Sequence, residues 1–241
     1  MNAADEGTRA TGLPEWWPSD KPYIIGDCLE GMKAIPDKSV DLVLTDPPYG
    51  INFSPHLKKW NGSRNNFERI TNDKGEINYK DIIYQFNRIS KRMIIFGAEN
   101  FYQSLPSRGS WICWDKRPAH IENEMIGTPF ELAWVDIDGM AYRMYRVLHG
   151  GVINADSAEG NNEKRLHPTQ KPITLFKKIL MDFSNIGDVI LDPFLGSGTT
   201  LAACRKTNRI GLGFEIEPAY EDAIIKRSLQ DIPRLETFEV K

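Results

Sequence analysis

Short apolar segments typical of β-strands alternate along this chain with longer segments in which apolar residues recur at spacings of three and four. The helical spacing occurs over residues 79–90, 173–183, 199–207 and 218–230. The strand-like segments are residues 23–25, 41–45, 92–96, 111–114, 132–135, 189–191 and 210–214. Strands joined through helices run in the same direction, so the alternation predicts an α/β fold with a mostly parallel, twisted sheet and helices on both faces.

The composition indicates one folded domain in a reducing compartment. The chain has 241 residues, a length that suits one large α/β domain or at most two small ones. Of these residues 41% are hydrophobic and 26% charged, which excludes a largely disordered chain. No apolar run approaches the roughly 18 residues of a membrane span, and no secretory signal is visible. Three widely spaced cysteines argue against a disulfide framework, and the four histidines show no metal-ligand spacing. We therefore expect a cytoplasmic protein that binds neither a membrane nor a metal ion.

Three segments fall outside the alternation. Residues 1–20 are polar and contain Pro-Glu-Trp-Trp-Pro at 14–18, so we expect an N-terminal arm whose tryptophans dock on a single domain at 21–241. Residues 51–78 and 136–166 are polar, contain glycines and show no sustained apolar period. Connections this long inside a compact domain are more often functional than idle. We expect the first to be a mobile loop and the second to be an insertion that recognises the substrate.

A glycine-rich turn joins the strand at 189–191 to the helix at 199–207. It reads Asp-Pro-Phe-Leu-Gly-Ser-Gly-Thr-Thr over residues 192–200. Glycine lets the backbone approach a ligand closely, and the start of a helix offers free amide groups. Glu215 follows Gly198 by 17 residues, close to the spacing at which an acidic residue reaches a ribose in nucleotide-binding folds. The pattern predicts a site for a nucleoside cofactor.

The residues around this turn narrow the choice of cofactor. Leu201 stands where a dinucleotide-binding loop has a small residue, and Gly198 is not followed by the lysine of a phosphate-binding loop. Asp192 opens the turn with a negative charge that repels a pyrophosphate and attracts a cationic amino-acid headgroup. With Glu215, this pattern favours S-adenosylmethionine, which carries an ammonium and a sulfonium. The alternative is an ordinary tight turn between a strand and a helix.

A second strand, at residues 41–45, ends in Asp46-Pro47-Pro48-Tyr49. Two consecutive prolines stiffen the chain as it leaves the sheet and remove two backbone donors. The Asp46 carboxylate and the Pro47 carbonyl then form two fixed acceptors beside the ring of Tyr49. That arrangement suits a planar ligand with an exocyclic amino group, such as adenine or cytosine. The alternative is a rigid turn with a capping aspartate.

Three motifs together resemble those of the β-class exocyclic-amino DNA methyltransferases. They are Asp-Pro-Pro-Tyr at 46–49, His-Pro-Thr-Gln-Lys-Pro at 167–172 and the glycine-rich turn at 192–200, and the resemblance spans about residues 22–230. The catalytic motif precedes the glycine-rich turn, which is the motif order of the β class. The resemblance implies a Rossmann-like S-adenosylmethionine-dependent methyltransferase fold with a circularly permuted motif order.

The resemblance also implies roles for individual residues. Asp46 and Pro47 would accept hydrogen bonds from the target amino group, with Pro48 holding the turn and Tyr49 stacking on the flipped base. The residues expected around the cofactor are Asp27, Cys28, His167, Thr169, Gln170, Lys171, Asp192, Phe194, Gly196, Ser197, Gly198, Thr199, Thr200 and Glu215. Asp27 would lie near the cofactor adenine, and its alternative role is that of a helix cap. No covalent cysteine step is needed for this reaction, so the three cysteines are interpreted as structural.

The implied activity is methylation of the N6 amino group of adenine in double-stranded DNA. Asp46 favours adenine, because the family's cytosine-N4 enzymes more often carry serine there; cytosine N4 is the alternative, and a catalytically silent cofactor- or DNA-binding subunit is a third. A base inside a duplex cannot reach such a pocket, so it must be flipped out. The resemblance also implies two candidate partners besides double-stranded DNA: a second copy of the chain, which would form a homodimer, and a cognate restriction endonuclease.

DNA binding would depend on local basic surfaces, since the net charge is −3. Residues 143–178 hold seven Lys and Arg against three acidic residues. The loop at 51–78 adds basic residues interleaved with aromatic ones, and residues 136–166 stand where β-class enzymes keep their target-recognition region. The side chains expected to contact DNA are Lys58, Lys59, Arg64, Arg69, Arg143, Arg146 and Arg165. The alternative for such clusters is a solvated surface.

Overall fold

The structure is a computed structural model that describes residues 12–49, 77–117, 128–150, 153–154 and 170–229. Its main sheet has eight strands in the order β1-β10-β9-β2-β3-β5-β4-β6. The strands are β1 (Tyr23–Ile25), β2 (Leu42–Thr45), β3 (Met93–Phe96), β4 (Ser110–Asp115), β5 (Phe130–Val135), β6 (Arg143–Arg146), β9 (Val189–Asp192) and β10 (Ile210–Glu215). Only β5 runs antiparallel to its neighbours among the pairs in this sheet. A separate antiparallel pair consists of β7 (His149–Gly150) and β8 (Ile153–Asn154).

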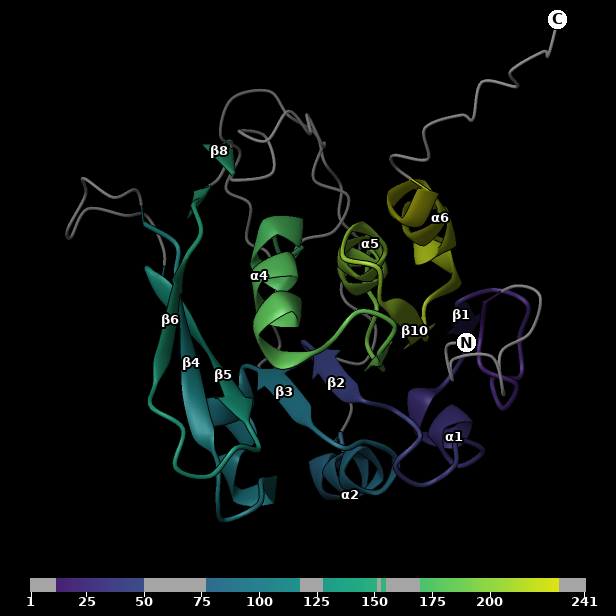
Figure 1. The fold of residues 1–241 in the computed structure, drawn as a ribbon, viewed down its shortest axis with the longest axis horizontal. Coiled ribbons are helices and arrows are strands. Elements are labelled where there is room, and N and C mark those ends of the chain that lie inside the picture. Colours follow the sequence, from purple (N-terminus) through teal and green to yellow (C-terminus); the bar gives the residue numbers. More distant parts are fainter. Residues whose placement is uncertain (1–11, 50–76, 118–127, 151–152, 155–169, 230–241) are drawn as a thin grey trace, which may run out of the picture.

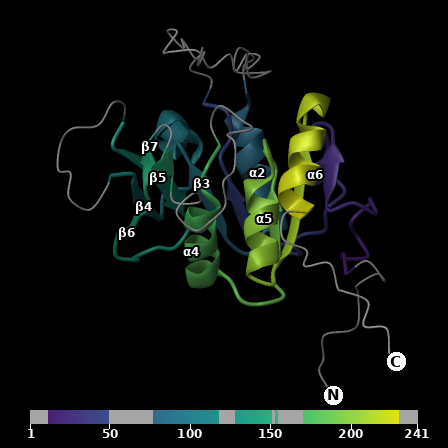
Figure 2. The same ribbon diagram turned by 90° about the horizontal axis from the view of Figure 1, so that it is seen from above.

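Helices cover both faces of the sheet (Figure 1). On one face lie α4 (Ile173–Phe183), α5 (Thr199–Lys206) and α6 (Glu221–Leu229), which stand side by side when seen from above (Figure 2). On the other face lie α1 (Cys28–Met32) and α2 (Tyr79–Ile89). Two short 3₁₀ helices, η1 (Ala98–Ser104) and η2 (Pro218–Tyr220), complete the described elements. The expected three-layer α/β fold with a mostly parallel sheet is confirmed.

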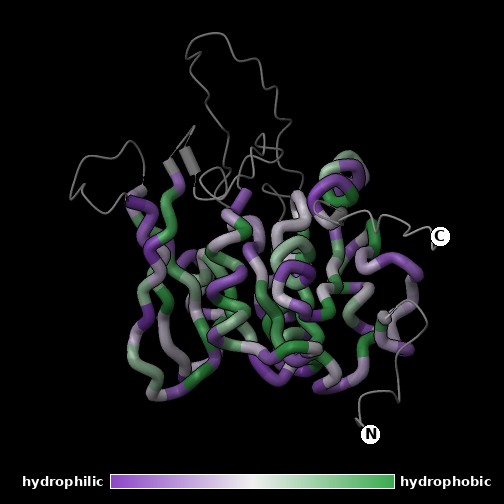
Figure 3. The backbone as a smooth tube through the Cα atoms, turned by 45° about the horizontal axis from the view of Figure 1, so that its top comes forward, coloured by the Kyte–Doolittle hydropathy of each residue, from purple (hydrophilic) through white to green (hydrophobic). Residues whose placement is uncertain are grey.

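The core follows from the alternation of side chains along each buried strand. On β2, Leu42 and Leu44 pack with α4 and α5, whereas Val43 faces the other way and packs with α2. All three side chains are fully buried, and each such side chain stabilises the fold by about 1.5–3 kcal/mol. Figure 3 shows the hydrophobic stretches running along the central strands. Strands buried on both faces explain why the segments read as continuous apolar runs.

The end of the N-terminal arm docks on the domain as expected. The Trp17 side chain is fully buried, its ring lies 5.3 Å from that of Phe214 on β10, and its indole N–H donates to the Lys21 carbonyl at 2.8 Å. Trp16 packs against the same cluster. Residues 1–11 of the expected arm lie outside the described residues.

The structure differs from the sequence expectations in the less regular segments. Within residues 136–166, residues 143–146 form β6, the outermost strand of the main sheet. The sequence did not predict this strand, because Arg-Met-Tyr-Arg lacks the apolar pattern of a buried strand. The helix expected at 218–230 begins as η2 and continues as α6. At the end of the loop expected at 51–78, Asn78 already caps α2, and residues 50–76 lie outside the described residues. Among the described helices, none is long and apolar enough to span a membrane.

Candidate active site

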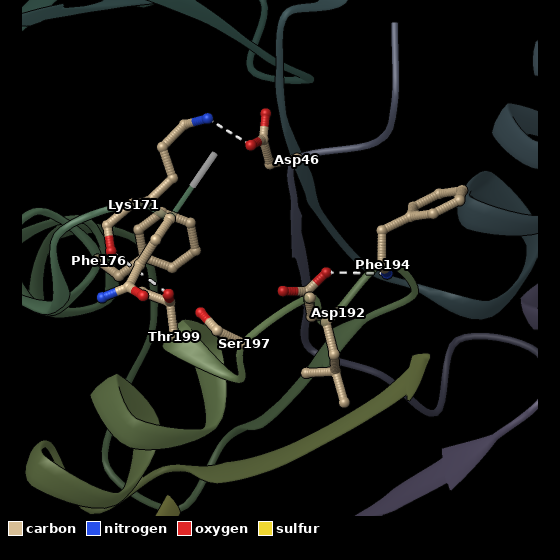
Figure 4. Close-up of a pocket in the computed structure, with 10 residues that line it drawn as sticks. Asp46, Lys171, Phe176, Asp192, Phe194, Ser197 and Thr199 are labelled. Atoms are coloured by element: carbon tan, nitrogen blue, oxygen red, sulfur yellow. Dashed lines mark hydrogen bonds and ion pairs between the residues drawn. The ribbon is translucent and has the colours of Figure 1, made fainter. Parts of the chain in front are cut away.

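Asp46 and the glycine-rich turn meet at the point where the sheet changes direction of winding. β2 and β9 are adjacent and parallel, with Val43 opposite Leu191. The chain leaves β2 for α2 on one face and leaves β9 for α5 on the other, and ligands bind at such switch points. A cavity opens there, between the Asp46 turn and the glycine-rich turn (Figure 4). It is lined by Asp46, Gln170, Lys171, Phe176, Asp192, Phe194, Leu195, Gly196, Ser197 and Thr199. Two motifs far apart in the sequence therefore share one cavity.

The glycine-rich turn has the backbone conformation that its glycines allow. Gly196 and Gly198 have φ values of 53° and 81°, which lie in the left-handed region. At Gly198 a Cβ would also lie 3.3 Å from the Ile224 Cα on α6, which is a tight contact. The turn delivers the chain directly into α5, whose first backbone amides have no helical acceptor of their own.

Asp192 ends β9 beneath the cavity. Its side chain is buried and accepts hydrogen bonds from the Thr45 hydroxyl at 2.7 Å, the Phe194 amide at 3.0 Å and the Thr200 hydroxyl. Burial raises the pKa of this carboxyl to about 6, although these donors oppose the rise.

Glu215 ends the neighbouring strand β10. One carboxylate oxygen accepts from the Gly196 amide at 2.7 Å and the other from the Glu217 amide at 2.9 Å. Burial raises the Glu215 pKa to about 7. Because the folded-state pKa values of Asp192 and Glu215 lie above their ordinary values, their contribution to stability is present at low pH and is lost as the pH rises through 6 to 7.

Asp46 is held by two donors at the other side of the cavity. The Tyr49 hydroxyl donates to its Oδ1. The Lys171 ammonium donates to the Asp46 Oδ2 (Figure 4). Lys171 also lies 3.2 Å from the Glu131 Oε2 on β5. Burial by itself would lower the pKa of Lys171, but the charges of Asp46 and Glu131 raise it well above the ordinary lysine value. The ammonium is therefore charged, and it bridges two carboxylates.

Tyr49 lies against the backbone of Gly97, which has a φ of 64°. A Cβ at Gly97 would lie 1.9 Å from the Tyr49 Cε1. The Tyr79 hydroxyl donates to the Pro48 carbonyl and fixes the same turn from α2. The expected aromatic face beside Asp46 is thus positioned by close contact with a glycine.

We expect Gly97→Ala to lower the free energy of unfolding by about 2–4 kcal/mol, because it adds a clash with Tyr49 to the strain of the left-handed backbone. Gly139→Ala is the matched control, since Gly139 has a φ of 69° and open space around a Cβ. That control should lose about 1 kcal/mol. Urea denaturation of both variants measures the difference, and equal losses would contradict the close contact.

Three residues that the sequence did not single out belong to this site. Thr45 binds Asp192, and Glu131 binds Lys171. Arg227 of α6 is fully buried and donates to the Ser197 hydroxyl at 2.8 Å and to the Thr199 hydroxyl. An arginine in the last turn of an amphipathic helix reads as a surface residue, so the sequence carried no signal for this contact.

The remaining residues expected at the site have mixed placements. Asp27 accepts from the Leu29 amide at 2.7 Å and caps α1, which is the alternative role named above, while its role toward a cofactor remains a prediction. Burial raises the pKa of the neighbouring Cys28 thiol to about 12, so it is neutral. The Lys171 ammonium lies on the Asp46 carboxylate, a partner that the sequence did not indicate. His167 and Thr169 lie outside the described residues.

The basic residues expected to contact DNA are described only in part. Arg146 is the last residue of β6 and donates to Asp115 at 2.9 Å. Like Asp46, which follows β2, it lies at the carboxyl ends of the parallel strands. Arg143 is the first residue of β6, at the amino end of the strand, and donates to Asp182 of α4 at 2.7 Å. The residues outside the described part of the chain are Lys58, Lys59, Arg64, Arg69 and Arg165. In the described ranges no group of three or more His, Cys, Asp or Glu side chains is placed to hold a metal ion.

Comparison with known proteins shows which family this chain resembles. A family model described as DNA methylase, for the N6 and N4 methyltransferases, matches residues 153–227. The type II methyltransferase M.HpaI of Haemophilus parainfluenzae is 27% identical over 229 residues, which cover 83% of this chain and 72% of M.HpaI. The type II methyltransferase M.HinfI of Haemophilus influenzae is 25% identical over 253 residues, covering 89% of this chain and 70% of M.HinfI. These matches support an exocyclic-amino DNA methyltransferase.

Solved structures of methyltransferases share the fold of this chain. The complex of M1.HpyAVI with S-adenosylmethionine is 23% identical, with a TM-score of 0.55 over 85% of this chain and 97% of that one. The cytosine-N4-specific PvuII DNA methyltransferase is 18% identical, with a TM-score of 0.57 over 87% of this chain and 86% of that one. The Rossmann-like methyltransferase fold is confirmed.

Proposed function

We propose that this methyltransferase transfers the methyl group of S-adenosylmethionine to the N6 amino group of adenine in double-stranded DNA. The observation that carries the proposal is the shared cavity, in which Asp46 lies at one side and the glycine-rich turn, from Asp192 to Gly198, at the other. The choice of adenine rests on Asp46, because the cytosine-N4 enzymes of this family more often carry serine there. Cytosine N4 is the second candidate, favoured by the likeness to the fold of the cytosine-N4-specific PvuII enzyme.

The buried residues around the glycine-rich turn fit such a cofactor. A carboxylate has about four lone-pair sites. Two of those on Glu215 are taken by backbone amides, so each oxygen keeps one for a ribose hydroxyl. Asp192 keeps a site on Oδ2 and carries its charge directly below the turn, where it would attract the ammonium of the methionine end. Gly196 lines the cavity and has the left-handed backbone that favours a residue without a side chain.

The residues around Asp46 would prepare the amino group for attack. S-adenosylmethionine supplies an activated methyl group on a sulfonium. The amino group of adenine is a weak nucleophile, because its lone pair is delocalised into the ring. Acceptance of its N–H groups by the Asp46 carboxylate and the Pro47 carbonyl would draw the nitrogen toward a tetrahedral geometry and free that lone pair. Positioning and electrostatics then suffice for the reaction.

The base would reach this site by flipping out of the duplex. Unstacking costs a few kcal/mol, and stacking on Tyr49 would offset roughly 1–3 kcal/mol of it. We propose Arg146 as a contact to DNA, because it lies at the carboxyl end of its strand, on the same side of the sheet as Asp46. The contacts expected from the other basic residues, a homodimer, a cognate restriction endonuclease and a cytoplasmic location remain predictions.

Cofactor affinity should depend on pH through Asp192. Below its pKa of about 6 the carboxyl is protonated and no longer attracts a cationic headgroup. We therefore expect the Kd for S-adenosylmethionine to rise about tenfold when the pH falls from about 7 to about 5. Isothermal titration calorimetry across this range measures the effect. The Asp192→Asn variant should bind weakly with a flatter profile, and an unchanged profile would contradict the assigned contact.

Digestion of methylated DNA to nucleosides tests the proposed function. The protein is incubated with methyl-labelled S-adenosylmethionine and mixed-sequence double-stranded DNA, and the nucleosides are separated. Label in N6-methyldeoxyadenosine is the expected result. Label only in N4-methyldeoxycytidine would show that the target base is cytosine, and unlabelled DNA would reject the proposed activity.

A further inference from the structure

The Lys171 ammonium occupies an oxygen of Asp46, the carboxylate to which the proposed function assigns the target amino group. The ammonium donates to the Asp46 Oδ2, and a target amino group would likewise bind Asp46 through N–H donors. The Lys171 side chain is 8% exposed and that of Asp46 16%, so water does little to weaken the pair. The cavity that would receive the base is lined by both residues. A base that binds Asp46 must therefore share the carboxylate with Lys171 or displace its ammonium.

A second position for the ammonium already exists. Glu131 Oε2 lies 3.2 Å from the Lys171 Nζ, and the Phe96 ring centroid lies 5.5 Å from the same atom. Glu131 is held in place by Lys116, which donates to its other oxygen. The long, flexible lysine side chain can shift between neighbouring carboxylates without moving the backbone.

We propose that Lys171 is a placeholder for the target amino group, and that Glu131 is the positioning residue that takes up its ammonium when the base enters. The proposal rests on the methyl transfer proposed above. In the empty site the Lys171 ammonium keeps the buried Asp46 carboxylate paired, which avoids the cost of an isolated buried charge. When the base binds Asp46, the ammonium keeps Glu131 and the Phe96 ring as partners, so no charge is left unpaired.

A purely structural salt bridge predicts a different pattern among the double variants. If Glu131 only stabilises the fold by pairing with lysines, any recovery in a double variant comes from removing an ammonium that has lost its partner, so Lys116→Met should restore activity as much as Lys171→Met. If Lys171 competes with the base, loss of Glu131 traps the ammonium on Asp46, and only the further loss of Lys171 frees Asp46 again. The comparison between the two double variants therefore separates the two explanations.

The experiment compares kcat/KM for DNA at saturating S-adenosylmethionine in Glu131→Gln and in two double variants. We expect Glu131→Gln to lower kcat/KM roughly tenfold or more, since it removes one partner of a buried charge pair. Adding Lys171→Met should raise kcat/KM at least about fivefold above that of the Glu131→Gln variant. Adding Lys116→Met is the matched control, because Lys116 binds the same Glu131 and is similarly buried, at 13% exposure, but has no hydrogen bond to Asp46 in the described contacts. It should restore nothing.

Cofactor binding separates these effects from damage to the fold. The Kd for S-adenosylmethionine should stay within about twofold of the wild type in Glu131→Gln and in its double variant with Lys116→Met, because neither residue is among those that line the cavity. Lys171 lines the cavity, so the Kd of the double variant with Lys171→Met is measured and the cofactor is kept saturating. No recovery with Lys171→Met, or equal recovery with Lys116→Met, would overturn the placeholder while leaving the proposed function intact. A wild-type protein that labels no DNA would instead reject the proposed function, and the placeholder with it.

Discussion

Replacing Asp46 with alanine should lower kcat for methyl transfer to DNA by roughly a hundred- to a thousandfold, the cost of removing one preorganised polar group from a reacting centre. The carboxylate is the acceptor that would draw the target nitrogen out of conjugation. Lys171 keeps Glu131 as a partner at 3.2 Å in this variant, so the fold should survive. The Kd for S-adenosylmethionine should stay within about twofold, because Asp192 and Glu215 remain. Rates with labelled cofactor and calorimetric titration measure the two quantities.

Asp41→Ala is the matched control for this substitution. Asp41 precedes the opposite end of the same strand, β2, where it accepts from Lys91 at 2.7 Å and from the Val189 amide at 2.8 Å. Its loss should reduce stability slightly and leave kcat within about twofold of the wild type. Full activity in the Asp46 variant would show that the chain does not use this carboxylate. Loss of cofactor binding along with activity would mean that Asp46 supports the fold of the cavity.

Replacing Arg227 with methionine should raise the Kd for S-adenosylmethionine at least about tenfold and lower the free energy of unfolding by about 2–4 kcal/mol. Arg227 is fully buried and donates to the hydroxyls of Ser197 and Thr199, on either side of Gly198. Its guanidinium therefore fixes the glycine-rich turn from below. Without these hydrogen bonds, the turn loses the geometry that brings its backbone to the ligand.

Arg205→Met separates this effect from a general weakening of helix packing. Arg205 also joins α5 to α6, through a hydrogen bond to the Ser228 carbonyl, but it does not contact the glycine-rich turn in the described structure. This variant should lose about 1 kcal/mol of stability and keep the wild-type Kd. Chemical denaturation and calorimetry on both variants give the comparison. If both arginine variants bind the cofactor equally well, Arg227 has no role in the turn.

The sequence predicts the centre of the fold well because burial constrains it on both sides. The segment at 41–45 becomes β2 and that at 173–183 becomes α4, since each carries an apolar pattern of the correct period. The shared cavity follows from the same logic, because Asp46 and Asp192 both come at the carboxyl ends of buried parallel strands. The adjacency of the two strands, β2 and β9, is seen only in the structure.

The sequence does not predict contacts that depend on which strands become neighbours. Glu131 reaches Lys171 because β5 inserts antiparallel between β3 and β4, an arrangement without a local sequence pattern. Arg227 reaches Ser197 because α6 packs on α5, which brings a basic residue under a turn some 30 positions earlier in the chain. β6 escapes detection for a different reason. Its side chains are largely exposed at a sheet edge, so neither face needs to be apolar.

A crystal structure of this protein with S-adenosylmethionine would show whether the Asp46 turn and the glycine-rich turn form one active site. We predict that the methionine end lies over Asp192 and the glycine-rich turn, that Glu215 binds the ribose hydroxyls, and that the sulfonium methyl points toward Asp46. A cofactor bound elsewhere, or one whose methyl group points away from Asp46, would contradict it.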